Sequence, residues 1–196
     1  MQTVHTHITA GHRLFDLKLG ELRRYRGLIW LFTKRSFVVT YKQTVLGPLW
    51  VLLTPLLTSF IHMVVFGGIA KLSTDGVPQL LFYLTGNALW GFFAACVASG
   101  CATFTTNASL FSKVYFPRLV MPLSDILGNA LRFAIQLIPV VILLGFYAVK
   151  GAVTPHFSCV IVVPFVLLQL AALGMGFGLI ISSLTTKYRD LRVLVS

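Results

Sequence analysis

The sequence predicts an all-α integral membrane protein, in which an interfacial amphipathic helix is followed by four transmembrane helices. Hydrophobic residues make up 57% of the 196 positions and charged residues only 11%, which is far from the composition of soluble domains. Four apolar runs reach the roughly 20 residues that a helix needs to cross a hydrocarbon core. They lie at about 49–70, 80–104, 119–149 and 157–184. The net charge of +11 would also suit a nucleic-acid-binding protein, but the apolar runs indicate a membrane protein instead.

Residues 1–20 are of mixed composition and are predicted to form a flexible N-terminal tail, because chain ends are poorly ordered unless other contacts hold them. Three histidines make a metal tract conceivable there, but we expect a tail and no metal site. Residues 21–196 are predicted to form one transmembrane domain. It begins with a helix at about 21–45, whose apolar stripe and cations favour a position in the plane of the membrane interface. The stripe comprises Leu28, Leu31 and Phe32.

A polar segment at 107–122 separates the second and third apolar runs and reads NASLFSKVYFPRLVMP. It must leave the hydrocarbon, where nothing would satisfy the backbone groups of a loop. A short helix here should end before Pro117, since the residue before a proline is pushed out of the α region. Pro122 suits the first turn of the next helix. The segment is either a loop that joins two spans or a docking element for a cytoplasmic partner.

The distribution of lysine and arginine predicts which side of the membrane each loop faces. Thirteen of the 16 basic residues precede the first run, lie between the second and third runs, or follow the fourth. The opposite side has only Lys71 and Lys150, and Arg132 lies within the third run. Both termini and the segment at 107–122 are therefore expected to face the cytoplasm.

Two charged residues, Asp125 and Arg132, lie in the third run. Intramembrane charges usually mark a bundle interior, an ion pair or a pathway. Their separation of seven residues places them on one helix face, roughly 10 Å apart along the axis. We therefore expect each to use other partners, or the two to meet only through long side chains. Alternatively, Asp125 could be an anion that stabilises the N-terminal end of its helix through the helix dipole.

Three blocks of sequence resemble a known family. They read YKQTVLGPLW at 41–50, SKVYFPRLVMPL at 112–123 and KYRDLR at 187–192. Their residues, order and spacing are similar, over about 25–196, to type-2 ABC exporter permeases that move polysaccharide. One departure is Thr40, where the family usually has an arginine before the Tyr-Lys pair. The phosphate-type contact of that arginine is therefore missing from this position.

The resemblance implies a permease subunit, and not an enzyme, of an ATP-driven exporter. Its substrate would be a lipid-linked polysaccharide, such as an O-antigen, a capsule or a related glycan, which crosses the bacterial inner membrane. The expected partners are an ABC ATPase subunit, a second copy of the permease, the lipid bilayer and the glycan substrate, with no nucleic acid. ATP and magnesium are expected on the ATPase and no cofactor on this chain, which has no Gly-x-x-x-x-Gly-Lys-Ser/Thr loop. The family has six spans, so the chain is expected to be C-terminally truncated or a fragment.

The resemblance also indicates candidate site residues. The ATPase dock is expected to comprise Lys113, Tyr115, Phe116 and Arg118. An accompanying interfacial and cytoplasmic motif comprises Tyr41, Lys42, Gln43, Lys187, Tyr188, Arg189 and Asp190. Aromatic rings pack on the apolar faces of sugars, so Trp90 and Phe93 are candidates for lining a glycan path. The alternative for these two is a lipid-facing aromatic belt.

Two other functions remain open. An ABC exporter for a small lipid or a drug would share the architecture, and only the polysaccharide-type blocks argue against it. A membrane-embedded glycan-processing enzyme would need clustered acids or a metal pair. The chain has five acidic residues, none of which pair closely in sequence, so no catalytic residue is expected.

Overall fold

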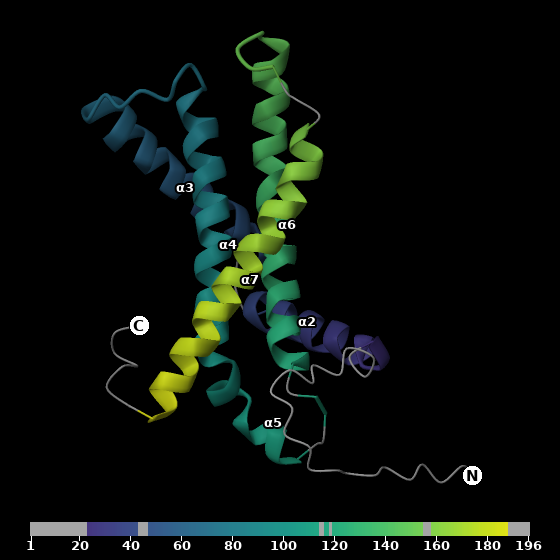
Figure 1. Ribbon diagram of the computed structural model, residues 1–196. Helices are drawn as coiled ribbons and strands as arrows, with labels where there is room; N and C mark the ends of the chain where they lie inside the picture. Colours follow the sequence, from purple (N-terminus) through teal and green to yellow (C-terminus); the bar gives the residue numbers. More distant parts are fainter. Residues whose placement is uncertain (1–22, 43–46, 114–115, 118, 155–157, 188–196) are drawn as a thin grey trace.

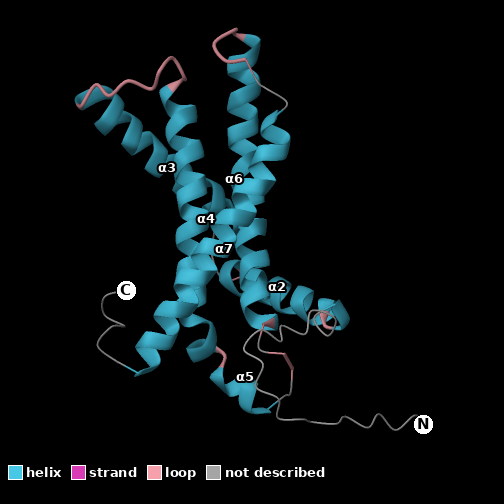
Figure 2. Ribbon diagram, viewed as in Figure 1, coloured by secondary structure: helices cyan, strands magenta, loops and turns pink. Residues whose placement is uncertain are grey.

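A computed structural model describes residues 23–42, 47–113, 116–117, 119–154 and 158–187, and within these ranges the chain forms helices and no strands (Figures 1 and 2). The elements are α2 (Arg26–Tyr41), η1 (Gly47–Leu49), α3 (Trp50–His62), η2 (Met63–Ile69), α4 (Gln79–Thr106), α5 (Ala108–Lys113), α6 (Val120–Val149) and α7 (Ser158–Lys187).

Four of the described helical stretches are long and apolar enough to cross a membrane, which confirms the predicted all-α membrane architecture. The stretches are Trp50–Ile69, Gln79–Thr106, Val120–Val149 and Ile161–Leu184. The first joins α3 to η2, a π-helix of seven residues at the far end of the span. All four spans agree with the apolar runs read from the sequence to within a few residues.

Helix α2 lies within the predicted interfacial helix at 21–45 and runs from Arg26 to Tyr41. Residues 1–22 and 43–46 lie outside the described part of the chain, and the predicted tail with them. Figure 1 shows that α2 runs across the lower part of the long helices instead of along them, as a helix in the plane of the interface would.

Helix α4 is the centre of the bundle and packs against α3, α6 and α7. One core cluster joins Ala88, Phe92 and Cys96 of α4 to Phe133 of α6 and Ala171 of α7. The Phe92 and Phe133 ring centroids lie 5.5 Å apart, within the range of favourable aromatic pairs. Because lipid is as apolar as these side chains, the cluster stabilises the bundle through close packing and not through removal of water.

A second cluster fixes α2 to the start of α6. Leu28 and Phe32 of α2 pack on a buried group that includes Phe116 and Val120. Leu31, by contrast, is exposed. The apolar stripe predicted to face the acyl chains is therefore divided, because two of its three members contact protein.

Glycines bring α4 and α7 into close contact. An added Cβ on Gly178 of α7 would lie 2.6 Å from the Val97 carbonyl oxygen and 2.8 Å from the Gly100 Cα of α4. One turn earlier, a Cβ on Gly174 would lie 2.8 Å from the Cys96 Cβ. Only residues without a side chain allow two backbones to approach this closely, a common device where membrane helices cross.

We predict that Gly178→Ala lowers the free energy of unfolding by about 1–3 kcal/mol, the usual cost of overpacking a well-packed contact. Gly176→Ala is the matched control, since an added Cβ there meets no atom within 4 Å. The control should be neutral or slightly stabilising, because alanine favours a helix over glycine. Unfolding of both variants by SDS titration in bicelles checks this, and equal stability of the two would contradict the close crossing.

Candidate functional site

Four polar side chains lie along one face of α6: Asp125, Asn129, Arg132 and Gln136. Their spacings of four, three and four residues place them in one row on a helix. We call this row the polar face of α6. The charges of Asp125 and Arg132 make these two residues conspicuous in the sequence. Asn129 and Gln136 are uncharged, and only their helical spacing from the charged pair indicates that they belong to the same row.

Asp125 is held by α4. The Thr103 hydroxyl lies 2.9 Å from Asp125 Oδ2 and 2.6 Å from the Ser99 carbonyl oxygen, so its single proton is shared between these two acceptors. Thr103 is buried. A buried hydroxyl next to a carboxylate supplies a charge-assisted hydrogen bond, which is stronger than a neutral one. This contact ties the two helices together near the start of α6.

Asn129 forms the next link between the two helices. Its Nδ2 donates to Ser99 Oγ at 3.2 Å and lies 3.7 Å from Cys96 Sγ, both on α4. Its Oδ1 accepts a bond from Arg132 Nη1 at 3.4 Å. Asn129 is buried, so these partners satisfy an amide that would be costly to leave unpaired in a membrane.

Arg132 reaches outward from the same face to α2. Its Nη2 lies 3.4 Å from Thr40 Oγ1, and its Nε is buried with no hydrogen-bond partner in the described part of the chain. Asp125 and Arg132 thus have separate hydrogen-bond partners. The contact with Thr40 also places the guanidinium beside the C-terminal end of the interfacial helix, although Arg132 lies well inside the third apolar run.

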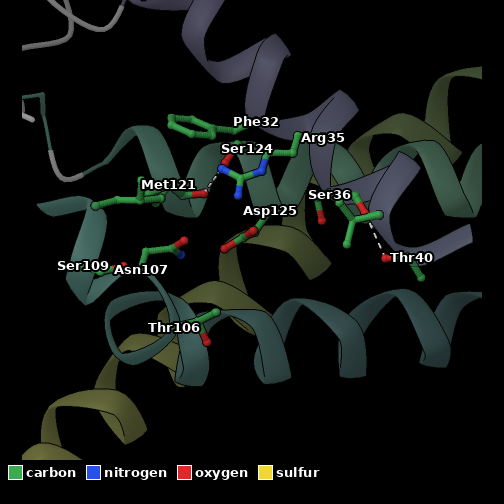
Figure 3. A pocket seen from close by; sticks show the side chains of 12 residues that line it. Phe32, Arg35, Ser36, Thr40, Thr106, Asn107, Ser109, Met121, Ser124 and Asp125 are labelled. Carbon is green, nitrogen blue, oxygen red and sulfur yellow. Dashed lines mark hydrogen bonds between the residues drawn. The ribbon is translucent and has the colours of Figure 1, made fainter. Parts of the chain in front are cut away.

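A hollow of about 420 Å³ lies where α2 meets the ends of α4 and α6 (Figure 3). Arg35 enters it from α2 and Asp125 from α6, and Asn107 lies at its edge. The remaining lining residues are Phe32, Ser36, Val39, Thr40, Thr106, Ser109, Leu110, Met121 and Ser124. One cation, one carboxylate and several hydroxyls make this surface polar with no dominant sign of charge.

Thr33 fastens α2 beside this hollow. Its side chain is fully buried, and its hydroxyl lies 3.1 Å from the Ser124 carbonyl oxygen of α6 and 2.9 Å from the Ile29 carbonyl of its own helix. A threonine in a helix commonly bonds the carbonyl four residues earlier. Here the same hydroxyl also approaches α6, so the position of the interfacial helix on the bundle is set by a polar contact as well as by apolar packing.

The predicted dock residues are only partly within the described chain. Lys113 is the last residue of α5, and Tyr115 and Arg118 lie outside the described residues. Phe116 is buried, and its ring lies 5.3 Å from Phe111 and 6.0 Å from Phe32 between centroids. The ring of Phe116 is therefore packed between α5 and α2 and is not a free docking surface.

The other candidate residues are scattered over the bundle. Trp90 is 68% exposed on α4, and its ring lies 5.7 Å from that of Phe93, which is half-buried. Tyr41 ends α2 and Lys42 follows it with an exposed side chain, while Lys187 ends α7. The motif residues outside the described part are Gln43, Tyr188, Arg189 and Asp190. Among the residues described, no group of three His, Cys, Asp or Glu side chains could hold a metal ion.

Comparison with known proteins gives a consistent result. Residues 27–196 match the family model described as ABC-2 type transporter. Two O-antigen export system permease proteins RfbA from Klebsiella pneumoniae are 30% and 31% identical over 169 residues, which is 86% of this chain and 63% of theirs. A protein of the same name from Myxococcus xanthus is 28% identical over 176 residues, which is 90% of this chain and 65% of its own. The chain therefore spans less than two thirds of the length of these curated relatives.

We predict that Thr103→Val lowers the free energy of unfolding by about 1.5–3 kcal/mol, because the half-buried Asp125 carboxylate loses the buried hydroxyl that binds it. Thr105→Val is the control, since Thr105 is exposed and bonds only the Ala102 carbonyl of its own helix. In an Asp125→Asn background the cost of Thr103→Val should shrink. If Thr103→Val costs as much in the Asp125→Asn background as in the wild type, the two side chains are not coupled. Thr103 would then stabilise the protein only through contacts within α4.

Proposed function

Because the chain belongs to the ABC-2 type transporter family, we propose that it is the membrane permease subunit of an ATP-driven exporter. Its substrate is a lipid-linked polysaccharide, an O-antigen, capsule or related glycan, which it moves across the bacterial inner membrane. The observation that carries the proposal is the set of curated relatives named as O-antigen export permeases, matched over most of this chain. ATP is hydrolysed on a separate ATPase subunit, and a second permease copy completes the path.

The arrangement of the helices supports a cytoplasmic position for one end of the bundle. α2, α5 and the end of α7 lie at the same end (Figure 1). The loops that contain Lys71 and Lys150 lie at the other. Since most basic residues of the chain belong to the first end, the positive-inside rule makes that end cytoplasmic. A cytoplasmic ATPase then reaches α5 and the end of α2.

The ATPase dock in this proposal is centred on α5 and the segment that follows it. Its proposed contact residues are Lys113, Tyr115 and Arg118, which supply two cations and an aromatic ring, and Phe116 packs against α2 next to them in the sequence. The motif around Lys42 and Lys187 flanks the dock. Trp90 and Phe93 line the glycan path where two permease copies meet, since an exposed tryptophan next to a second ring offers a face on which a sugar packs.

The proposed substrate predicts a specific stimulation of ATP hydrolysis. The permease, co-purified with its ATPase and reconstituted in proteoliposomes, should hydrolyse ATP faster when lipid-linked glycan is added than when bare carrier lipid or a drug mixture is added. The reason is that a substrate shifts a transporter only through differential binding to its conformations. Stimulation by drugs alone would favour the small-molecule exporter, and glycosyl transfer without ATP would favour the enzyme.

The proposed dock predicts a loss of partner binding on charge reversal. The double variant Lys113→Glu, Arg118→Glu should co-purify with clearly less ATPase, by about tenfold, since truncating or reversing interface charges commonly costs a few kcal/mol. Lys150→Glu, at the opposite end of the bundle, is the control and should leave co-purification unchanged. Both variants should insert into the membrane at wild-type level. Normal ATPase recovery and export in the double variant would exclude these two side chains from the dock.

A further inference from the structure

The Arg132 guanidinium lies level with the first turn of α3, where the first span begins. Arg132 is twelve residues beyond the start of α6, or roughly 18 Å along its axis. Yet it contacts Thr40 near the end of α2, and it shares a hollow with Trp50, the first residue of α3. The first three turns of α6 therefore project beyond the level at which α3 begins, so that Arg132 is level with the start of the first span.

The guanidinium makes no direct ion pair in the described part of the chain, and the Asp125 carboxylate on the same helix interacts with its charge only at a distance. A guanidinium has five N–H donors. Two of its nitrogens make bonds of 3.4 Å, long for hydrogen bonds, to Asn129 and Thr40, and the buried Nε has none. The neighbouring charges on α2, Arg35 and Lys42, are also positive. A cation with unused donors and no carboxylate in direct contact is suited to an anionic ligand.

A hollow beside Arg132 has room for such a ligand. It measures about 260 Å³ between α3 and α6, several times the share of about 30 Å³ that one water molecule has in the liquid. Thr54 and Gln136 add a hydroxyl and an amide to its wall. The remaining lining residues are apolar or aromatic: Trp50, Val51 and Pro55. The hollow thus has hydrogen-bond donors on one side and apolar side chains on the other. A suitable ligand is an amphiphile with a small charged group.

We propose that this hollow binds the phosphate of a glycerophospholipid from the leaflet on which α2 lies. The planar fork of Arg132 can bind two phosphate oxygens at once, while Gln136 and Thr54 reach the remaining oxygens. The glycerol and the upper acyl chains lie along Trp50, Val51 and Pro55, and tryptophan is typical of this depth. The bound lipid neutralises Arg132 and bridges α3 to α6. The proposal rests on the function above only in naming that leaflet as cytoplasmic.

The test is lipid binding by the full chain, purified in mild detergent with whatever partner subunit it retains. Native mass spectrometry with added phosphatidylglycerol should show one lipid bound per chain. Arg132→Gln should weaken this binding by about tenfold or more, as expected for a lost charge-assisted pair. Arg132→Lys should be intermediate, because it keeps the charge and loses the fork. Arg26→Gln is the matched control, an exposed arginine of α2 outside the hollow, and should bind like the wild type.

The choice of added ligand separates the possible occupants. Inorganic phosphate and diacylglycerol should both bind poorly. Inorganic phosphate has no acyl chain for the apolar wall, and diacylglycerol has no phosphate for Arg132. If polyprenyl diphosphate binds more tightly than phosphatidylglycerol, and through Arg132, the hollow belongs to a transport substrate and the phospholipid assignment is overturned. Equal phosphatidylglycerol binding by the wild type and Arg132→Gln overturns it as well, and leaves the hollow to water.

A second pair of variants keeps the test valid if Arg132→Gln does not fold. Thr54→Val and Gln136→Leu retain the arginine and remove the other polar groups of the hollow. Each should weaken phosphatidylglycerol binding severalfold, and unchanged binding in both would overturn the proposal. Because binding is measured without transport, a permease that fails to respond to glycan would disprove the proposed substrate and leave this result standing.

Discussion

The hydrocarbon core of the membrane is the constraint from which the rest of the structure follows. It offers no water to backbone amides and carbonyls, so each crossing segment must satisfy them internally as a helix. The chain obeys this from Trp50 to Ile69 and in three further spans. The polar segment at 107–122 is excluded from the core for the same reason, and α5 within it lies at the end of the bundle where α2 crosses it.

The same constraint gives α4 two different kinds of neighbour. Toward α7 it presents Gly100, and the two backbones approach until an added Cβ on Gly178 of α7 would overlap the Val97 carbonyl. Toward α6 it presents hydroxyls, with Thr103 on Asp125 and Ser99 on Asn129. The α4–α7 interface is held by close packing, whereas the α4–α6 interface adds paired polar groups to the packing of Phe92 on Phe133. These are the two main sources of helix association where the hydrophobic effect is absent.

The staggered ends of the helices give the polar face of α6 its chemistry. Asp125 lies at the end of the bundle and lines the hollow beside α2. Arg132 lies two turns further along α6 and lines a different hollow, at the start of α3. Residues on one helical row are thus exposed to different surroundings. Helix α2 contacts both positions, through Thr33 near Ser124 and through Thr40 at Arg132. If a partner or a lipid displaced this interfacial helix, its contacts with α6 at Ser124 and Arg132 would therefore change directly.

The sequence by itself determined the helical spans, their number within this chain and the polar segment between the second and third. These depend on how each residue partitions between lipid and water, which is a local property that composition and periodicity record. It also placed Pro122 in the first turn of α6 and put Asp125 and Arg132 on one face.

Only the tertiary structure decided which side chains meet. Phe116 is buried against Phe32, Arg132 reaches Thr40, and Thr103 serves Asp125, across sequence separations of 84, 92 and 22 residues. Each contact depends on the crossing angle and the axial offset of two helices. Those quantities are set by close packing over the whole interface, as at the glycines of α4 and α7, and not by the residues of either helix alone.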